Sequence, residues 1–309
     1  MQDARVEVER MARPNWDDLK VFLAVARAES LTGAGRSLRV DPATVGRRIA
    51  RLERALGALL FARSPQGYAL TPEGQRLMAQ AARAEEEMAR AFEELDAEAG
   101  QLTGQIRLGA PDGSANFLLP QVCAAIAAQN PDLEVQIVAL PRVFNLSKRE
   151  ADMAIGVSAP TAGRLRVEKL TDYRLHLAAS RAYLDAAPPI RTLGDLSRHR
   201  IVGYIQDMIF DRELDYLSEA GLDAVHLASN SVSVQLNWIR QGAGVGVVHD
   251  FAIPSAPGVE RILTHEVSLT RSFYLIRHAD NLRLERLDRF AAALAEGMRR
   301  EVARLEALA

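Results

Sequence analysis

The sequence contains a single cysteine, Cys123, among its 309 residues. One thiol cannot form a disulfide within the chain, and such sparse use of cysteine is typical of proteins in a reducing compartment. Cys123 lies in an apolar helical segment between Leu118 and Ala128, so a buried and unreactive thiol is predicted. The sequence therefore offers neither a disulfide framework nor an activated cysteine nucleophile.

Long apolar runs are missing as well. No stretch approaches the roughly 20 apolar residues of a membrane-spanning helix, and residues 1–13 are charged and lack the apolar segment of a signal peptide. Met1 and Met11 are both candidate start residues. We therefore expect a cytoplasmic protein with no membrane partner. Its length and its 48% hydrophobic content predict about two domains with a substantial core.

Signatures of catalysis are equally scarce. The six histidines are scattered, with no pair at the spacing of metal ligands, and no G-x-S-x-G nucleophile motif occurs. The glycines of residues 242–246 join a predicted helix to a predicted strand, which is the wrong order for a dinucleotide-binding fingerprint. We predict no catalytic residue, no metal and no cofactor. An enzyme built on an α/β fold is the alternative.

Positive charge is concentrated near the N-terminus, although the whole chain has a formal net charge of −2. Between Arg36 and Arg63 there are seven arginines and only two acidic residues, a local net charge of +5. A basic surface on a small helical unit is typical of a DNA-binding module. A solvated face on an ordinary helical bundle is the alternative.

The apolar periodicity predicts three short helices followed by a hairpin. The first helix has an apolar face made of Leu19, Phe22, Leu23 and Ala26. The second spans about Leu31 to Leu38, and Asp41 with Pro42 starts the third, whose inward face is made of Val45, Ile49, Leu52 and Leu56. Two helices joined by a short turn have the geometry of a helix-turn-helix. The hairpin, with its turn at residues 64–67, is predicted to form a wing.

Five motifs follow one another without gaps between Trp16 and Gly74: Asp18-Leu19-x-x-Phe22, Ser30-Leu31-Thr32, Ala43-Thr44-Val45-x-Arg47-Arg48-Ile49-x-x-Leu52-Glu53, Leu60-Phe61-x-Arg63 and Leu70-Thr71-x-x-Gly74. This pattern resembles that of the LysR-type transcriptional regulators. The resemblance implies an α/β protein with an all-α N-terminal part. It implies a winged helix-turn-helix domain over 14–71, a linker and dimerisation helix over 72–100, and an effector-binding domain over 104–309.

Residues on the outer face of the third helix and in the wing are candidates for DNA contact. Arginine pairs bidentately with guanine, and Thr44 can meet a thymine methyl or a phosphate. The predicted contacts are Thr32, Arg36, Pro42, Ala43, Thr44, Gly46, Arg47, Arg48, Arg51, Arg63 and Gln66. Pro42 and Gly46 depart from the residues usual in the family, which moves the expected base readout towards Thr44, Arg47 and Arg48. Gly33 and Gly35 replace the alanines usual in the second helix, and each glycine destabilises that helix by up to about 1 kcal/mol relative to alanine.

A long helix is predicted from Pro72 to about Ala99. Its narrow apolar seam consists of Met78, Ala81, Met88, Phe92 and Leu95, and a helix with one narrow stripe requires a partner helix. Packing on the chain's own C-terminal domain is the alternative. The resemblance implies a homodimer or homotetramer, formed through this helix, on a pseudo-palindromic operator of double-stranded DNA. RNA polymerase is a further candidate partner.

From residue 105 onward, strands alternate with helices, which predicts a largely parallel α/β sheet. The predicted strands are Gln105–Gly109, Leu133–Val138, Asp152–Val157, Leu175–Ala179, Arg200–Tyr204, Val225–Leu227, Val245–Val248 and Ser272–Arg277, with a long helix from about Leu282 to Leu305. The resemblance implies two lobes like those of periplasmic solute-binding proteins. Lobe I comprises 104–171 and 268–309 and lobe II 172–267, with crossings near Thr171–Arg174 and Glu266–Arg271.

Polar residues where strands end and helices begin are candidates for binding a small-molecule effector, since free amides converge there. They are Asp112, Gly113, Ser114, Asn145, Gln206, Asn230, Ser231, Val248 and His249. Several of these have simple helix capping as the alternative role, and His249 is expected in a partly exposed loop. Family members often bind carboxylates, which Asp112 would disfavour unless it is paired or turned away.

Together these features predict a sequence-specific DNA-binding transcriptional regulator that responds to a small molecule bound between two lobes. A non-specific DNA binder is the remaining alternative. It leaves the long C-terminal region and the near-neutral net charge of the chain unexplained.

Overall fold

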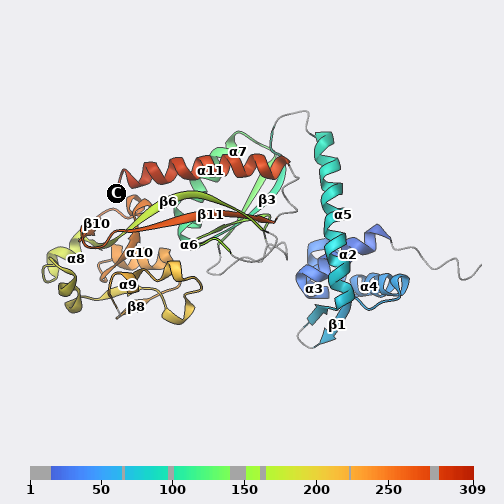
Figure 1. The fold of residues 1–309 in the computed structure, drawn as a ribbon, viewed down its shortest axis with the longest axis horizontal. Coiled ribbons are helices and arrows are strands. Elements are labelled where there is room, and N and C mark those ends of the chain that lie inside the picture. Colours follow the sequence, from blue (N-terminus) through green and yellow to red (C-terminus); the bar gives the residue numbers. More distant parts are fainter. Residues whose placement is uncertain are drawn as a thin grey trace, which may run out of the picture. The chain divides into compact units, whose positions relative to one another are not determined.

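The computed structural model describes residues 15–64, 67–96, 101–139, 151–160, 165–222, 224–278 and 285–309. The chain forms two compact units, Met1–Asp96 and Ala97–Ala309 (Figure 1), here called the N-terminal and the C-terminal unit. No helix in the described ranges is long and apolar enough to cross a membrane.

The N-terminal unit contains four helices and a hairpin among its described residues. These elements are α2 (Trp16–Ala28), α3 (Leu31–Leu38), α4 (Pro42–Leu56), β1 (Phe61–Ser64), β2 (Gly67–Leu70) and α5 (Pro72–Asp96). The three predicted short helices and the antiparallel hairpin are confirmed. Each helix start carries its cap, since the side chains of Asn15, Ser30 and Asp41 accept hydrogen bonds from amides of the first turns.

The core of this unit lies between α2, α4 and the hairpin. Its buried side chains include Phe22, Leu23, Val45, Ile49, Leu52, Leu60 and Phe61. Three of the four residues predicted on the inner face of α4 are therefore confirmed. Leu56 is 38% exposed, because the helix ends at Gly57, whose left-handed φ of 63° turns the chain away.

Gly35 permits the close approach of the two helices of the helix-turn-helix. A Cβ atom at this position would lie 2.6 Å from the backbone oxygen of Val40. The amide of Val40 in turn donates to the carbonyl of Gly35 at 2.9 Å. The glycine therefore serves the tight turn between α3 and α4 rather than the helix that contains it.

In the C-terminal unit the described strands form one nine-stranded sheet. The strands are β3 (Gly104–Ala110), β4 (Leu133–Ala139), β5 (Met153–Gly156), β6 (Leu165–Ser180), β7 (Ile201–Gly203), β8 (Leu227–Ala228), β9 (Val245–His249), β10 (Val259–Ile262) and β11 (Leu269–His278). Their order is β4-β3-β5-β11-β6-β9-β7-β8, and β10 pairs with β6. Each of the eight predicted strands overlaps an observed one, although the predicted Val225–Leu227 shares only Leu227 with β8, and β10 was not predicted.

The predicted largely parallel sheet is wrong, because two long antiparallel strands run through its middle. β6 and β11 pair along their length, from Leu269 opposite Leu175 to His278 opposite Leu165. β5 and β9 join them in antiparallel pairs, while β3–β4, β3–β5, β7–β8 and β7–β9 are parallel. The first half of β6 was missed because it alternates exposed charged residues with partly buried ones and contains no apolar run.

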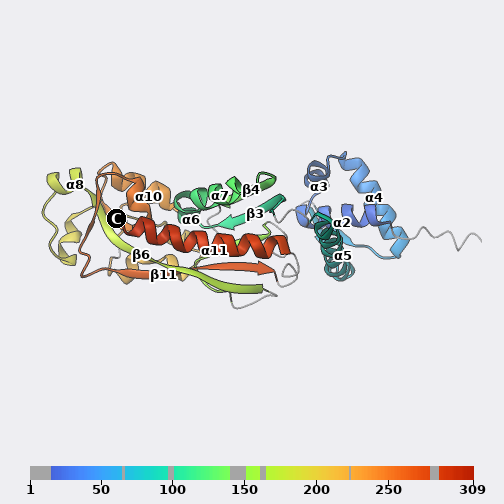
Figure 2. The same cartoon turned by 90° about the horizontal axis from the view of Figure 1, so that it is seen from above.

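Helices cover the sheet, and three of the intervals between its strands contain 3-10 segments. The helices are α6 (Asp112–Phe117), α7 (Leu119–Ala128), α8 (Arg181–Ala186), α9 (Tyr216–Glu219), α10 (Val232–Arg240) and α11 (Glu285–Glu306). The 3-10 segments are η3 (Leu193–Arg198), η4 (Gln206–Met208), η5 (Arg212–Leu214) and η6 (Asp250–Ser255). The long helix α11 confirms the predicted C-terminal helix, and it packs along β6 and beside α7 (Figure 2).

Candidate DNA-binding surface and effector site

The N-terminal turns of α4 present small and basic side chains outside the core. Ala43 and Arg47 are exposed, and Thr44 and Arg48 are half-buried, while Val45 between them is buried. The Arg47 guanidinium donates to Thr44 Oγ1 at 2.7 Å, which fixes both side chains on one side of the helix. Thr32 and Arg36 of α3 are also exposed. Gly46 and Pro42 lie half-buried at the same end of α4.

Arg51 has a partner in another helix of the unit. Its guanidinium pairs with the carboxylate of Asp18 in α2, whose side chain is 3% exposed. Hydrogen bonding to that carboxylate raises the pKa of Arg51. The arginine therefore connects α2 to α4, and the DNA contact predicted for it stays a prediction.

The wing is attached to α4 through a buried carboxylate. Glu53 accepts hydrogen bonds from the amides of Leu60 and Phe61, at 2.9 and 3.4 Å. The amide of Tyr68 donates to the carbonyl of Glu29 at 2.9 Å, so the second strand is joined to the end of α2. The side chain of Arg63 and all of Gln66 lie outside the described residues.

The predicted dimer seam on α5 is partly used within the N-terminal unit. Ala81 is 2% exposed and Met78 is partly buried, and both pack against the core that contains Phe22. An ion pair between Arg27 and Glu85 also joins α5 to α2. Met88 is 39% exposed, and the side chains of Phe92 and Leu95 lie outside the described ones. Neither the dimer seam nor the alternative, packing on the C-terminal domain, predicted that α5 contacts α2.

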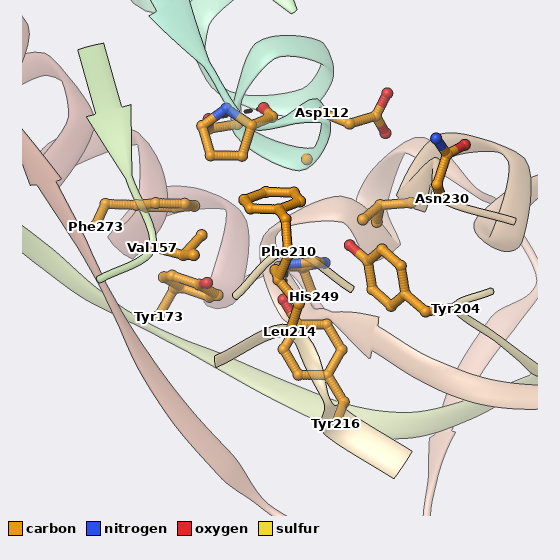
Figure 3. Close-up of a pocket in the computed structure, with 14 residues that line it drawn as sticks. Asp112, Val157, Tyr173, Tyr204, Phe210, Leu214, Tyr216, Asn230, His249 and Phe273 are labelled. Carbon is orange, nitrogen blue, oxygen red and sulfur yellow. Dashed lines mark hydrogen bonds between the residues drawn. The ribbon is translucent and has the colours of Figure 1, made fainter. Parts of the chain in front are cut away.

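Five of the predicted effector residues line one pocket of the C-terminal unit, here called the aromatic pocket. They are Asp112, Gly113, Ser114, Asn230 and His249 (Figure 3). Five aromatic side chains complete its walls, namely Tyr173, Tyr204, Phe210, Tyr216 and Phe273. These come from β6, from β11 and from the segment that runs from the end of β7 to the first residue of α9. The cavity between them is about 20 Å³, which is enough for about one water molecule.

The Asp112 carboxylate is paired within the protein. Its pairing was left open by the sequence, and an unpaired carboxylate would disfavour an anionic effector. Its carboxylate accepts hydrogen bonds from the amide and the hydroxyl of Ser233, at 2.9 and 3.0 Å, and from the Ser231 hydroxyl at 3.2 Å. Ser231 is the N-cap of α10. The start of α10 is therefore already occupied by a carboxylate from α6.

His249 is buried rather than partly exposed, which corrects the expectation for this residue. It is the last residue of β9 and is 3% exposed, with the rings of Tyr173, Tyr216 and Phe251 around it. Burial lowers the pKa of His249 to about 3. The ring is therefore uncharged at neutral pH.

Of the four other predicted effector residues, three lie elsewhere in the structure and one is not described. Val248 is buried in β9 beside His176 and does not line the aromatic pocket. Gln206 is exposed and lines a second small cavity with Tyr204 and Tyr216. Ser231 acts through Asp112, and Asn145 lies outside the described residues.

Sequence reasoning missed the aromatic residues that form most of the pocket wall. The sequence did carry one signal for two of them. Tyr173 lies in one of the two predicted crossings between the lobes, and Phe273 lies two residues beyond the other. Tyr204 is two residues before Gln206 in the sequence, which was predicted to bind the effector. For Phe210 and Tyr216 the sequence carries no such signal, since Phe210 lies between two 3-10 turns and Tyr216 begins a four-residue helix, and neither segment is long enough to show periodicity.

Other reactive groups do not form a site in the described part of the chain. No cluster of His, Cys, Asp and Glu there has a geometry that could hold a metal ion. Cys123 is buried in α7, as predicted, and burial raises the pKa of its thiol to about 11. A thiol that stays protonated at neutral pH does not support a redox switch.

Comparisons with known proteins match both parts of the chain. Residues 16–75 match the model of bacterial regulatory helix-turn-helix proteins of the lysR family, and residues 99–299 match that of the LysR substrate binding domain. The chain is 27% identical over 251 residues to the HTH-type transcriptional regulator PtxR of Pseudomonas aeruginosa, covering 80% of each chain. It is 26% identical over 263 residues to the Mau operon transcriptional activator of Paracoccus denitrificans, covering 85% and 89%.

A solved structure shows the same fold. A full-length OxyR variant from Pseudomonas aeruginosa superimposes with a TM-score of 0.68 at 21% identity, covering 92% of this chain and 94% of that one. The predicted fold class is thereby confirmed, with a helix-turn-helix domain followed by a two-lobed α/β domain. The chain therefore belongs to the LysR family of transcriptional regulators, which bind DNA and small-molecule effectors and are not enzymes.

Proposed function

We propose that this regulator reads a pseudo-palindromic operator with the first turns of α4, chiefly through Thr44, Arg47 and Arg48. The single observation that carries this proposal is the outward, basic start of α4. There the Arg47–Thr44 hydrogen bond holds the guanidinium ready for a base edge. Arg36 and Arg63 are proposed to contact phosphates, which give affinity without sequence preference.

The test compares two arginines of the same helix on operator and scrambled DNA. Replacing Arg47 with alanine should weaken operator binding by about 1–3 kcal/mol while changing binding to scrambled DNA much less. Arg54→Ala is the matched control, because Arg54 is also exposed but bonds to the carbonyl of Ala50 near the other end of α4. Equal losses for both variants on both DNAs would show that only charge matters, and base readout by Arg47 would be wrong.

We propose that the effector binds in the aromatic pocket. With the predicted lobe boundaries, Asp112 and Phe273 belong to lobe I, while Tyr204 and His249 belong to lobe II, so a ligand in the pocket touches both. The hydrogen bonds from Ser231 and Ser233 to Asp112 are then contacts between the lobes. An effector that binds more tightly to one arrangement of the lobes shifts the population towards it.

We also propose that α5 joins two copies in the cytoplasm and that RNA polymerase is a partner at the promoter. The exposed Met88 supports a contact through the C-terminal half of α5, beyond the part that Ala81 fixes to the N-terminal unit. The names of several relatives describe activators, among them the Mau operon protein, which favours contact with polymerase for this chain.

A further inference from the structure

We infer that the effector is an uncharged aromatic molecule with one hydrogen-bonding group, such as a hydroxyl or an amide. Its ring takes the place of the Phe210 side chain, and its polar group binds His249 and Tyr173. This inference rests on the effector site proposed above and adds the chemistry of the ligand to it.

The walls of the aromatic pocket favour a flat ring. Tyr173 stacks on Phe273, with ring centroids 4.2 Å apart and an angle of 21° between the ring planes. It also stacks on His249 at 5.4 Å and 26°. Tyr204 and Tyr216 meet edge to face at 5.9 Å. Aromatic surfaces in such stacked and edge-on arrangements recognise another ring better than a flexible aliphatic chain.

Phe210 now fills the space that a ligand ring would need. Figure 3 shows its side chain projecting into the middle of the lining residues. Because the remaining cavity is only about 20 Å³, a ring enters only if a side chain leaves. Phe210 is the best candidate, since it is only half-buried and lies between two 3-10 turns, whereas Tyr173 and Phe273 are buried in long strands. A bond from the Ser158 hydroxyl to Asp211 holds this segment in place.

The charges around the pocket disfavour a carboxylate ligand. Among the described residues that line it there is no lysine or arginine, and the one charged group is Asp112. The start of α10, which would otherwise attract an anion, is occupied by that same carboxylate. His249 is uncharged because of its burial. An anionic ligand would therefore be buried without a partner charge, which is costly.

A polar atom without a partner indicates where the ligand's polar group binds. His249 Nδ1 is buried and has no hydrogen-bond partner, and buried polar atoms are normally paired. Its Nε2 lies 3.4 Å from the Tyr216 hydroxyl, a contact in which either group can donate, so Nδ1 is a donor in one tautomer of the neutral ring and an acceptor in the other. The Tyr173 hydroxyl is likewise buried, and its neighbour is the hydroxyl of Tyr216. A hydroxyl or an amide of a ligand, which can both donate and accept, supplies the partner that His249 Nδ1 lacks.

The test uses three probes of one shape, benzamide, benzoate and toluene, titrated into the full-length protein and followed by ligand-detected NMR. Benzamide should bind at least tenfold more tightly than benzoate. Phe210→Ala should strengthen benzamide binding, because it opens a hole the size of a ring. His249→Phe should weaken the binding of benzamide at least fivefold and leave the binding of toluene unchanged. This difference distinguishes a lost hydrogen bond from damaged packing.

Gly113→Leu reports on the location, because a Cβ at Gly113 would lie 3.5 Å from the His249 ring. Binding that survives this change would overturn the proposed site itself. Tighter binding of benzoate that Gly113→Leu abolishes would keep the site and overturn the inferred ligand class. Absence of benzamide binding to both the wild type and Phe210→Ala would overturn the class as well.

Discussion

Replacing Gly35 with alanine tests how the helix-turn-helix is built. Helix propensity alone predicts that this change stabilises α3 by up to about 1 kcal/mol. The structure predicts the opposite, because the new Cβ would lie 2.6 Å from the carbonyl oxygen of Val40. That oxygen belongs to the backbone of the turn, whose geometry the bond from the Val40 amide to the Gly35 carbonyl also fixes.

The expected size follows from these two opposing effects. Overpacking against a backbone atom costs about 1–3 kcal/mol, and the gain in helix propensity offsets up to about 1 kcal/mol of this. Taking the middle of the first range, about 2 kcal/mol, we expect a net destabilisation of about 1–2 kcal/mol. For a unit of this size each kcal/mol lowers the melting temperature by about 4–8 °C.

The measurement follows unfolding of the N-terminal unit alone. The chain has two tryptophans, so Trp238→Phe leaves Trp16 of α2 as the only indole reporter. Gly46→Ala is the matched control, because its Cβ would meet only the end of the Leu31 side chain at 3.4 Å, and this change should be neutral or stabilising. If Gly35→Ala melted at the wild-type temperature or above, the proposed reason for this glycine would be refuted.

Three further predictions concern buried polar groups. Glu53→Ala should destabilise the N-terminal unit by about 1–3 kcal/mol, because the amides of Leu60 and Phe61 lose their acceptor; denaturant titration should show little change for the exposed Glu73→Ala. Because the folded pKa of His249 lies near 3, the unfolded chain binds the extra proton between about pH 3 and 6.5, so stability falls as the pH falls. This group alone should remove about 1.4 kcal/mol between pH 8 and 5.5, and a wild-type pH dependence equal to that of His249→Phe would contradict it. Cys123 should react with a thiol reagent at pH 8 only after unfolding, since burial raises its pKa to about 11; rapid modification of the native protein would disprove its burial.

The N-terminal unit could be predicted closely from the sequence because its signals are local. Asp41 and Pro42 mark a helix start through the capping of free amides, and Leu31–Leu38 was predicted at its observed bounds. The role of Gly35 could not be foreseen, since the contact it permits is made with Val40 after the chain has turned. The partner of Arg51 was equally hidden, because Asp18 is 33 residues away.

The C-terminal unit was predicted less well because its defining contacts are long-range. Strand direction in β6 and β11 depends on pairing between residues about 100 positions apart, which periodicity does not encode. The polar members of the pocket follow a rule about strand ends, and so Asp112 and Asn230 were found. The aromatic wall follows from tertiary packing, and Phe210 could be placed only by the structure.

The central claim is that this chain is a site-specific DNA-binding regulator, and fluorescence anisotropy on the DNA upstream of its own coding region tests it most directly. Wild-type protein is titrated against that duplex and a scrambled one of equal length at several salt concentrations. Our account predicts binding to the upstream DNA that is tighter by ~10³-fold or more, and a preference that Arg47→Ala reduces. Equally weak binding to both duplexes, with the same steep salt dependence, would contradict it.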